Sequence, residues 1–138
     1  MELRWTSPDD EALVAAAVHL FDSVPAAETI RRFLTTPGHH LCLAFVDGVA
    51  VGFVSGVETT HPDKGTEMFV YELAVDEPAR RRGVGAALVA EIRRRATDLG
   101  CYGMWVLTDA GNEAAARTYA SAGARSPSEH VMFEWQLR

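Results

Sequence analysis

The segment between residues 75 and 88 constrains the fold of this chain most, because it joins a strand to a helix through an arginine- and glycine-rich turn. Val75 ends an apolar run that is rich in β-branched residues. From Val84 to Leu99, apolar residues recur at intervals of three and four, and Gly100 follows. This spacing predicts an amphipathic helix that ends at the glycine. A strand that leads directly into such a helix is typical of α/β domains.

Strands and helices are also expected along the rest of the sequence. Strands are expected at residues 2–5, 41–46, 49–57, 68–75, 102–107 and 130–137, and helices at residues 7–21, 26–35, 84–99 and 112–122. Ser7 is the expected N-cap of the first helix, Asp47-Gly48 predicts a tight hairpin, and residues 59–65 are predicted as a loop. The order β-α-α-β-β-β-α-β-α-β predicts one α/β domain over residues 1–138, with a mixed central sheet flanked by helices.

The turn before the third long helix has the chemistry of an anion site. The first N–H groups of a helix have no intrahelical partner and lie at its positive dipole end. Gly83 and Gly85 let the backbone approach a phosphate closely, and Arg80, Arg81 and Arg82 add positive charge. These residues predict a pyrophosphate site, although a solvated arginine turn with two ordinary turn glycines remains the alternative.

Two common nucleotide motifs do not match this turn. A dinucleotide-binding fingerprint needs a third glycine where the chain has Leu88, and no Gly-Lys-Ser/Thr follows for a phosphate-binding loop of the NTPase type. The ligand is therefore expected to be a pyrophosphate-containing molecule of another class.

Two motifs resemble the GNAT (GCN5-related N-acetyltransferase) superfamily. Arg80-x-x-Gly83-x-Gly85-Ala86 is similar to its acetyl-CoA motif, and Asn112-x-x-Ala115-x-x-x-Tyr119 is similar to its second signature. The resemblance covers residues 2–137. It implies a single-domain GNAT fold and an acetyl-CoA-dependent N-acetyltransferase, with acetyl-CoA as co-substrate and no metal.

The resemblance also implies a role for individual residues. In such enzymes the loop amides bind the pyrophosphate, the backbone of the fourth strand pairs with the pantetheine amides, and an asparagine on the following helix contacts the pantetheine arm. The implied coenzyme-binding residues are Leu73, Ala74, Val75, Arg80, Arg81, Arg82, Gly83, Val84, Gly85, Ala86, Asn112, Ala115 and Tyr119.

Tyr119 matches the general acid of the family, which protonates the departing thiolate. A phenol with a pKa near 10 can donate a proton to a thiolate whose conjugate acid has a pKa near 8.5, provided that the two lie within hydrogen-bond distance. The alternative is a tyrosine that only packs against the core. Glu72 lies among apolar neighbours in a strand and is the candidate base that takes the proton of the attacking amine.

Asp109 follows a strand at the edge where open sheets bind ligands, and is a second candidate for substrate contact. Either acid could instead pair with an arginine or cap a helix. The residues 70–75 and 108–111 more narrowly resemble the type I aminoglycoside 3-N-acetyltransferases, also called gentamicin or fortimicin acetyltransferases, in which acids recur at the positions of Glu72 and Asp109. This implies that acetyl is transferred to the 3-amino group of an aminoglycoside by direct attack in a ternary complex.

Three other functions remain open at this point. The chain could acetylate another small-molecule amine or a peptide or protein N-terminus. It could be a coenzyme-A-binding sensor without turnover, or a protein that binds no coenzyme and uses its arginines to hold an acidic partner.

Charge and composition restrict the kinds of molecule that the chain is expected to bind. Thirteen basic and nineteen acidic residues give a net charge of −6, which suits a polycationic small molecule and argues against a nucleic-acid groove. No apolar run approaches the ~18 residues of a membrane helix, so no membrane partner is expected. The first residues do not resemble an export signal, which predicts a cytoplasmic location. Relatives often dimerise through their C-terminal strands, so a homodimer is a further expectation.

Several residues have an ordinary structural interpretation. Cys42 and Cys101 are expected to be buried, reduced thiols. His39 and His40 lack a third metal ligand at a recognisable spacing and are expected in a turn before a strand. Trp105 and Trp135 lie on predicted strands and are expected in the core.

Overall fold

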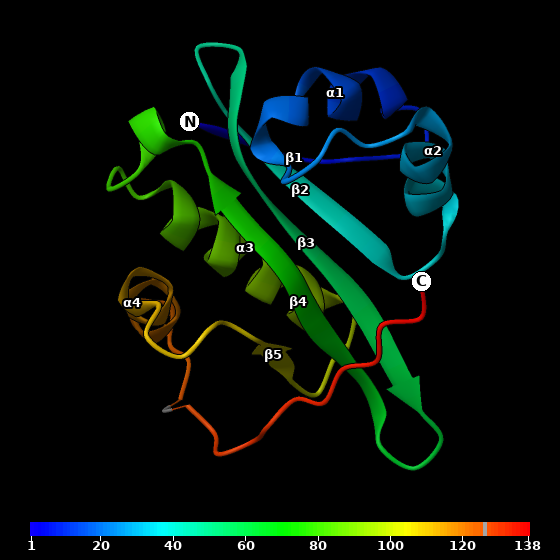
Figure 1. Cartoon of the computed structure of the whole chain (residues 1–138), viewed down its shortest axis with the longest axis vertical. Helices are drawn as coiled ribbons and strands as arrows, with labels where there is room; N and C mark the ends of the chain where they lie inside the picture. Colours follow the sequence, from blue (N-terminus) through cyan, green and yellow to red (C-terminus); the bar gives the residue numbers. More distant parts are fainter. Residues whose placement is uncertain (126) are drawn as a thin grey trace.

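The computed structural model describes residues 1–125 and 127–138. It contains one five-stranded sheet with the spatial order β1-β2-β3-β4-β5 (Figure 1). The strands are β1 (Glu2–Trp5), β2 (His39–Val46), β3 (Val49–His61), β4 (Gly65–Val75) and β5 (Met104–Val106). The first four pair antiparallel and β5 pairs parallel to β4, so the sheet is mixed, as predicted.

Helices cover both faces of this sheet (Figure 1). They are α1 (Glu11–Ala16), the short 3₁₀ helix η1 (Val18–Leu20), α2 (Ala27–Thr35), the 3₁₀ helix η2 (Glu77–Ala79), α3 (Val84–Asp98) and α4 (Glu113–Ser121). Among the described residues, no helix is long and apolar enough to cross a membrane. The expected α/β class is confirmed, as is the expected single domain with a mixed sheet flanked by helices.

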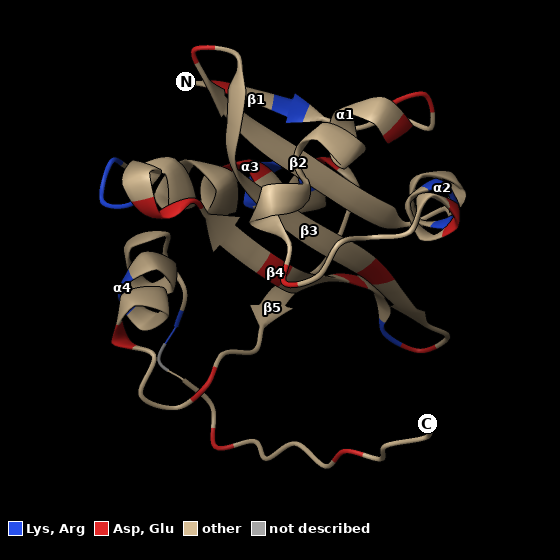
Figure 2. Ribbon diagram, turned by 45° about the horizontal axis from the view of Figure 1, so that its top comes forward, with Lys and Arg blue, Asp and Glu red and all other residues tan. Residues whose placement is uncertain are grey.

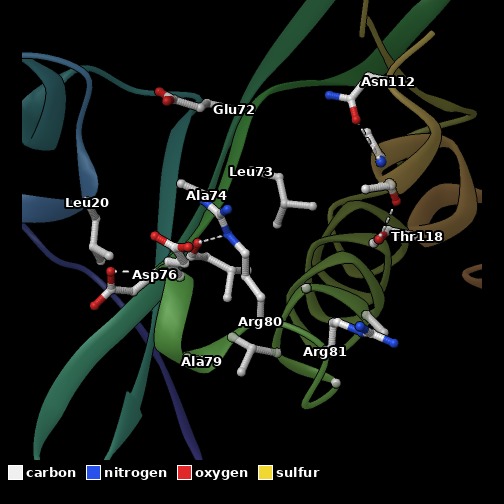
Figure 3. A pocket seen from close by; sticks show the side chains of 18 of the residues that line it. Leu20, Glu72, Leu73, Ala74, Asp76, Ala79, Arg80, Arg81, Asn112 and Thr118 are labelled. Carbon is white, nitrogen blue, oxygen red and sulfur yellow. Dashed lines mark hydrogen bonds between the residues drawn. The ribbon is translucent and has the colours of Figure 1, made fainter.

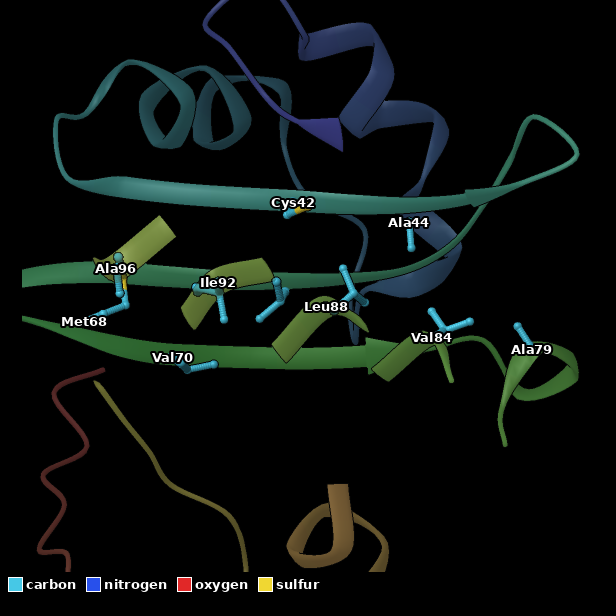
Figure 4. Packing of buried hydrophobic residues seen from close by; sticks show 10 residues of the cluster. Cys42, Ala44, Met68, Val70, Ala79, Val84, Leu88, Ile92 and Ala96 are labelled. Carbon is cyan, nitrogen blue, oxygen red and sulfur yellow. The ribbon is translucent and has the colours of Figure 1, made fainter. Parts of the chain in front are cut away.

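One core lies between α3 and the sheet (Figure 4). Its buried residues are Cys42, Ala44, Val54, Met68, Val70, Ala79, Val84, Leu88, Ile92 and Ala96. The helical members recur every four residues, which is the apolar stripe that the sequence predicted. The glycines of β3 allow the close approach: a Cβ on Gly56 would lie 2.6 Å from Ile92 Cδ1 and 2.8 Å from Met68 Sδ.

A second core lies on the other face, beneath α1 and α2. It contains Val14, Ala17, Leu20, Ile30, Leu41, Leu43, Ala50 and Phe53. Alternate residues of β2 and β3 enter the two cores, because successive side chains of a strand point to opposite faces.

The hairpins are partly as expected. Asp47 and Gly48 have positive φ angles of 50° and 77°, the geometry that a two-residue hairpin turn requires, so this prediction is confirmed. The loop predicted at residues 59–65 exists but is shorter, at residues 62–64, since β3 runs to His61 and β4 begins at Gly65. Polar residues continue the pairing, with the Thr60 and Thr66 hydroxyls 2.9 Å apart, because backbone hydrogen bonds do not need apolar side chains.

The first helix begins later than expected. Asp10 occupies the N-cap position, and its carboxylate accepts hydrogen bonds from the backbone N–H and the hydroxyl of Ser7. Ser7 as N-cap is therefore wrong: the serine stabilises the preceding turn instead. The helix also ends at Ala16, and η1 replaces its last predicted turn.

The final strand predicted at residues 130–137 is not formed. Residues 127–138 have no partner in the sheet, and Trp135 is 79% exposed, contrary to its expected place in the core. The alternating pattern supplies one apolar side but no hydrogen-bonding partner, and β5 is too short to offer a long free edge. Trp105 is also partly exposed, where its ring stacks on that of Phe69 with centroids 4.2 Å apart.

The cysteines and the histidine pair have structural roles. Cys42 is buried and Cys101 half-buried, and both are free thiols. Burial, reinforced by the charge of Glu91, raises the pKa of Cys42 to about 12, which makes it a poor nucleophile at neutral pH. His39 and His40 lie within β2 rather than in a turn, and His40 Nε2 lies 2.8 Å from the Glu58 carboxylate.

Candidate functional site

The two strands at the open end of the sheet diverge. β5 pairs with β4 only from Met68 to Val70, whereas β4 continues to Val75. A bulge begins the divergence, because Gly56 pairs with Val70 and Ser55 with Glu72, which leaves Tyr71 as an extra residue. Among the residues that the structure describes, the β4 backbone beyond Val70 therefore has no neighbouring strand on this side. Such an edge can pair with an extended ligand that carries amide groups.

A large groove runs along this edge (Figure 3). Its walls come from the end of β4, from η2, from the start of α3, from α4 and from the segment around η1. The groove has a volume of about 1270 Å³. This exceeds the roughly 300–1,000 Å³ typical of a site for one drug-sized ligand. It therefore has room for a long ligand and a second molecule beside it.

Most of the site residues predicted from sequence line this groove. They are Glu72, Leu73, Ala74, Val75, Arg80, Arg81, Gly83, Val84, Gly85, Ala86, Asn112, Ala115 and Tyr119. Two do not: Arg82 lies in the exposed turn before α3, and Asp109 lies in the loop after β5. The Asp109 carbonyl accepts a hydrogen bond from the backbone N–H of Asn112, so Asp109 helps to shape the turn into α4.

The start of α3 has the geometry of an anion site. Gly83 is the N-cap residue with a φ angle of 82°, and the preceding Arg81 also has a positive φ, of 61°. Left-handed geometry is uncommon for a residue with a Cβ and clusters at ligand sites. Figure 2 shows the arginine-rich turn in blue beside α3. The Arg80 Nε donates to the Val75 carbonyl at 3.0 Å, which ties this turn to the end of β4.

Gly85 marks the narrow part of the groove. A Cβ built on Gly85 would lie 3.5 Å from Thr118 Cγ2 and 3.7 Å from Val75 Cγ2. These are ordinary van der Waals contacts, so the fold tolerates a side chain here. The contacts also show that such a side chain would project into the space between α3, α4 and β4, where a ligand would pass.

Asn112 begins α4 at the far wall of the groove (Figure 3). Its Oδ1 accepts a hydrogen bond from the Ala115 N–H at 3.1 Å, so Asn112 is the N-cap of this helix. The sequence motif did not reveal this structural role. Because Oδ1 is engaged, the Nδ2 amide is the group of Asn112 with which a ligand carbonyl could interact.

Tyr119 lies on the same helix, α4, and is half-buried. Burial raises the pKa of its phenol. The hydroxyl therefore keeps its proton at neutral pH and can act as a hydrogen-bond or proton donor to a ligand in the groove.

Glu72 lies on β4 at the junction of the groove with the η1 side of the molecule. Its pKa is raised, first by burial and then by the negative charge of Asp22. Asp22 also lines the groove and was missed in the sequence, where nothing relates a residue after the first helix to a distant strand. A carboxylate with a raised pKa accepts a proton more readily, which suits a general base.

Comparisons with known proteins agree with this geometry. Residues 4–124 match the model of the acetyltransferase (GNAT) family. The chain is 34% identical over 102 residues to a mycothiol acetyltransferase of Salinispora arenicola, a match that covers 74% of this chain and 29% of that protein. It is 32% identical over 83 residues to an L-2,4-diaminobutyric acid acetyltransferase of Nocardia farcinica, with 60% and 42% covered. The matches therefore span less than half of either relative.

Solved structures share the fold at lower identity. An aminoglycoside acetyltransferase from an uncultured soil metagenomic sample, in complex with sisomicin, superposes with a TM-score of 0.91 and 19% identity, covering 99% of this chain and 96% of that one. The aminoglycoside N-acetyltransferase AAC(6')-Iy in complex with CoA superposes with a TM-score of 0.80 and 21% identity, covering 99% and 95%.

Proposed function

The chain belongs to the acetyltransferase (GNAT) family, and we propose that it transfers the acetyl group of acetyl-CoA to a primary amine of a small molecule. The observation that carries this proposal is the groove itself. It joins an unpaired strand edge, a helix start flanked by arginines, a half-buried tyrosine and a carboxylate with a raised pKa.

Each part of the groove suits one part of the coenzyme. The pyrophosphate binds to the backbone amides of residues 83–86, and Arg80, Arg81 and Arg82 neutralise its charge. The pantetheine arm pairs with the backbone of residues 73–75 and contacts Asn112 and Ala115. AAC(6')-Iy, which shares this fold, has been solved with CoA bound.

The transfer proceeds by direct attack in a ternary complex. Glu72 takes a proton from the ammonium group, directly or through a water molecule, because a protonated amine has no lone pair for attack. The amine nitrogen then bonds to the thioester carbonyl carbon, the carbon–sulfur bond breaks, and Tyr119 donates its proton to the departing thiolate. The second proton that the nitrogen loses passes through water to the Tyr119 phenolate, which restores the tyrosine. The volume of the groove, about 1270 Å³, supports simultaneous binding of both substrates.

We propose that the acceptor is an aminoglycoside, acetylated at its 3-amino group. The groove carries the carboxylates of Asp22, Glu72, Asp76 and Glu77, and the net charge of the chain is −6. Acidic clefts concentrate polycations and speed their encounter. Asp109 remains a proposed contact for a part of the sugar that extends beyond the groove lining. The 3-amino position rests on the sequence resemblance alone, so mapping the acetylated product decides it.

We also propose that the chain forms a homodimer through residues 130–137. The apolar side chains of this segment are exposed, up to 90% for Leu137. A contiguous row of exposed apolar side chains is typical of an interaction surface. The cytoplasmic location stays a prediction.

A thiol-release assay tests the function directly. We expect free coenzyme A to accumulate with acetyl-CoA and an aminoglycoside such as sisomicin or gentamicin. Binding of acetyl-CoA without thiol release from any amine would identify a sensor instead. Absence of acetyl-CoA binding by calorimetry would contradict the proposal altogether.

A further inference from the structure

A second cavity also borders Glu72. It has a volume of about 220 Å³ and lies between α2 and the sheet. Phe21, Ile30 and Phe33 form its outer walls, and Phe53 lies at its floor. Among the described residues that line it, Glu72 is the one carboxylate, and none is a lysine, arginine or histidine. The same Glu72 lines the coenzyme groove, so both spaces border one carboxylate.

The walls of this cavity favour an apolar guest. The rings of Phe21 and Phe53 lie against each other, with centroids 4.6 Å apart, and Ile30 and Phe53 are buried. A polar group placed against these walls loses its hydrogen bonds with water, whereas an apolar group gains from leaving water. Aromatic walls also favour an aromatic guest, which can meet the rings by edge or by face.

The size of the cavity limits that guest to a compact group. An apolar cavity of about 150 Å³ in another protein binds benzene. The 220 Å³ here holds one ring or a branched alkyl chain with its linker. It is smaller than the roughly 300–1,000 Å³ of sites that enclose drug-sized ligands, so an aminoglycoside does not fit inside.

We infer that the enzyme also acetylates compact apolar monoamines of the arylalkylamine class, whose ring fills this cavity while the primary amine lies at Glu72. The inference rests on the proposed acetyltransferase function and adds a substrate class to it. The chemistry is unchanged: Glu72 accepts a proton from the ammonium, the amine nitrogen bonds to the acetyl carbon, and the carbon–sulfur bond breaks as Tyr119 protonates the thiolate. The second proton of the nitrogen passes through water to the Tyr119 phenolate. A polycationic sugar approaches Glu72 from the groove, whereas an arylalkylamine reaches it from the cavity.

Two variants of α2 separate the cavity from the groove. Thr29 lines the cavity but is exposed, so Thr29→Trp places an indole across the opening without disturbing the core. The neighbouring Glu28 is also exposed on α2 and does not line the cavity, which makes Glu28→Trp the matched control. Thiol release is then measured with phenethylamine and with sisomicin for the wild type and both variants.

We expect the wild type to acetylate phenethylamine. In Thr29→Trp, the ratio of kcat/KM for phenethylamine to that for sisomicin should fall at least ~10-fold, mainly through KM, because the indole excludes the phenyl ring and the burial of two methylene-sized groups already changes kcat/KM by more than about tenfold. Glu28→Trp should change this ratio less than about twofold. In a series of n-alkylamines, kcat/KM should rise by about fourfold for each methylene until the cavity is full.

Three results would overturn the inference. One is no turnover of phenethylamine under conditions where sisomicin is acetylated, which leaves the proposed function intact. The second is an equal change of the ratio in Thr29→Trp and Glu28→Trp. The third is an absence of thiol release with every amine, which rejects the proposed function as well. Turnover of phenethylamine without turnover of any aminoglycoside supports the inference and rejects only the aminoglycoside assignment.

Discussion

Glu72 shows how a neighbour distant in sequence can tune one residue of the site. Burial of its carboxylate and the negative charge of Asp22 both favour the protonated form, so the pKa of Glu72 is raised. A general base works only when it is deprotonated. The rate should therefore increase with pH as Glu72 loses its proton, over a range above that of an ordinary glutamate.

The first prediction concerns this pH dependence. Burial is the main cause of the raised pKa of Glu72, and Asp22→Asn removes the second cause, the repulsion by Asp22, so the acidic limb of the kcat/KM profile should move part of the way to lower pH. Glu72→Gln should lower kcat/KM on the order of 10²-fold and flatten this limb. Asp47→Asn, in the exposed β2–β3 turn, is the matched control and should leave the profile unchanged. An acidic limb that persists unchanged in Glu72→Gln would show that another group titrates.

The second prediction concerns Tyr119. Tyr119→Phe removes the proton donor and keeps the ring, so kcat should fall by about 10²-fold while the affinity for acetyl-CoA measured by calorimetry changes little. Tyr102→Phe alters an exposed tyrosine outside the groove lining and should have no effect. Turnover within about threefold of wild type in Tyr119→Phe would assign the tyrosine a packing role.

At the scale of the elements, the proposed coenzyme site depends on how α3 meets β4 and α4. The helix places its first turn beside the end of β4, because its apolar stripe packs against the sheet from Val84 to Ala96. The bulge at Tyr71 separates β4 from β5 and opens the edge along which the pantetheine arm is proposed to lie. The site needs both the packing of α3 against the sheet and the bulge in β4.

The third prediction tests this junction. Gly85→Val adds a side chain that projects toward Thr118 and Val75, into the narrow part of the groove, and should abolish acetyl-CoA binding in a folded protein. Gly83→Val should do the same, with added strain from the positive φ angle. Gly103→Val is the control, since a Cβ there meets no atom within 4 Å and Gly103 does not line the groove. Calorimetry gives the affinities, and circular dichroism checks the fold. Unchanged affinity in Gly85→Val would place the pyrophosphate elsewhere.

At the scale of the whole molecule, the C-terminal segment is the part least integrated with the sheet. Val131, Met132, Phe133, Trp135 and Leu137 are all exposed, although most of the other large apolar residues pack in the two cores. Burial of one such side chain contributes about 1.5–3 kcal/mol, so covering the whole row is strongly favoured. A second copy of the chain offers the same surface in a two-fold arrangement.

The fourth prediction is the oligomeric state that follows. Light scattering after size-exclusion chromatography should give a mass twice that of the 15.0 kDa chain. The double substitution Phe133→Asp and Trp135→Asp should shift this mass to that of the monomer. The matched control is Val24→Asp, which changes an exposed apolar residue in the loop before α2. A monomeric wild type at micromolar concentration would contradict the proposed dimer.

What the sequence determined by itself lies in short stretches of chain. The Asp47-Gly48 turn, the apolar stripe of α3 and the limits of α4 follow from dihedral preferences and side-chain periodicity within a few residues, so each was predicted where it occurs. The glycines and arginines before α3 indicated an anion site for the same reason, since a helix start presents its own amides wherever it lies.

The tertiary structure decided every feature that depends on contacts between distant parts of the chain. A strand forms only where a neighbour offers hydrogen bonds, so polar residues extended the β3–β4 hairpin while the apolar alternation of residues 130–137 produced no strand. The divergence of β4 from β5, the charge of Asp22 near Glu72 and the apolar cavity that borders Glu72 arise from long-range packing. Periodicity describes which side of an element is apolar, but contact between distant elements depends on register and on the shape of the space between them.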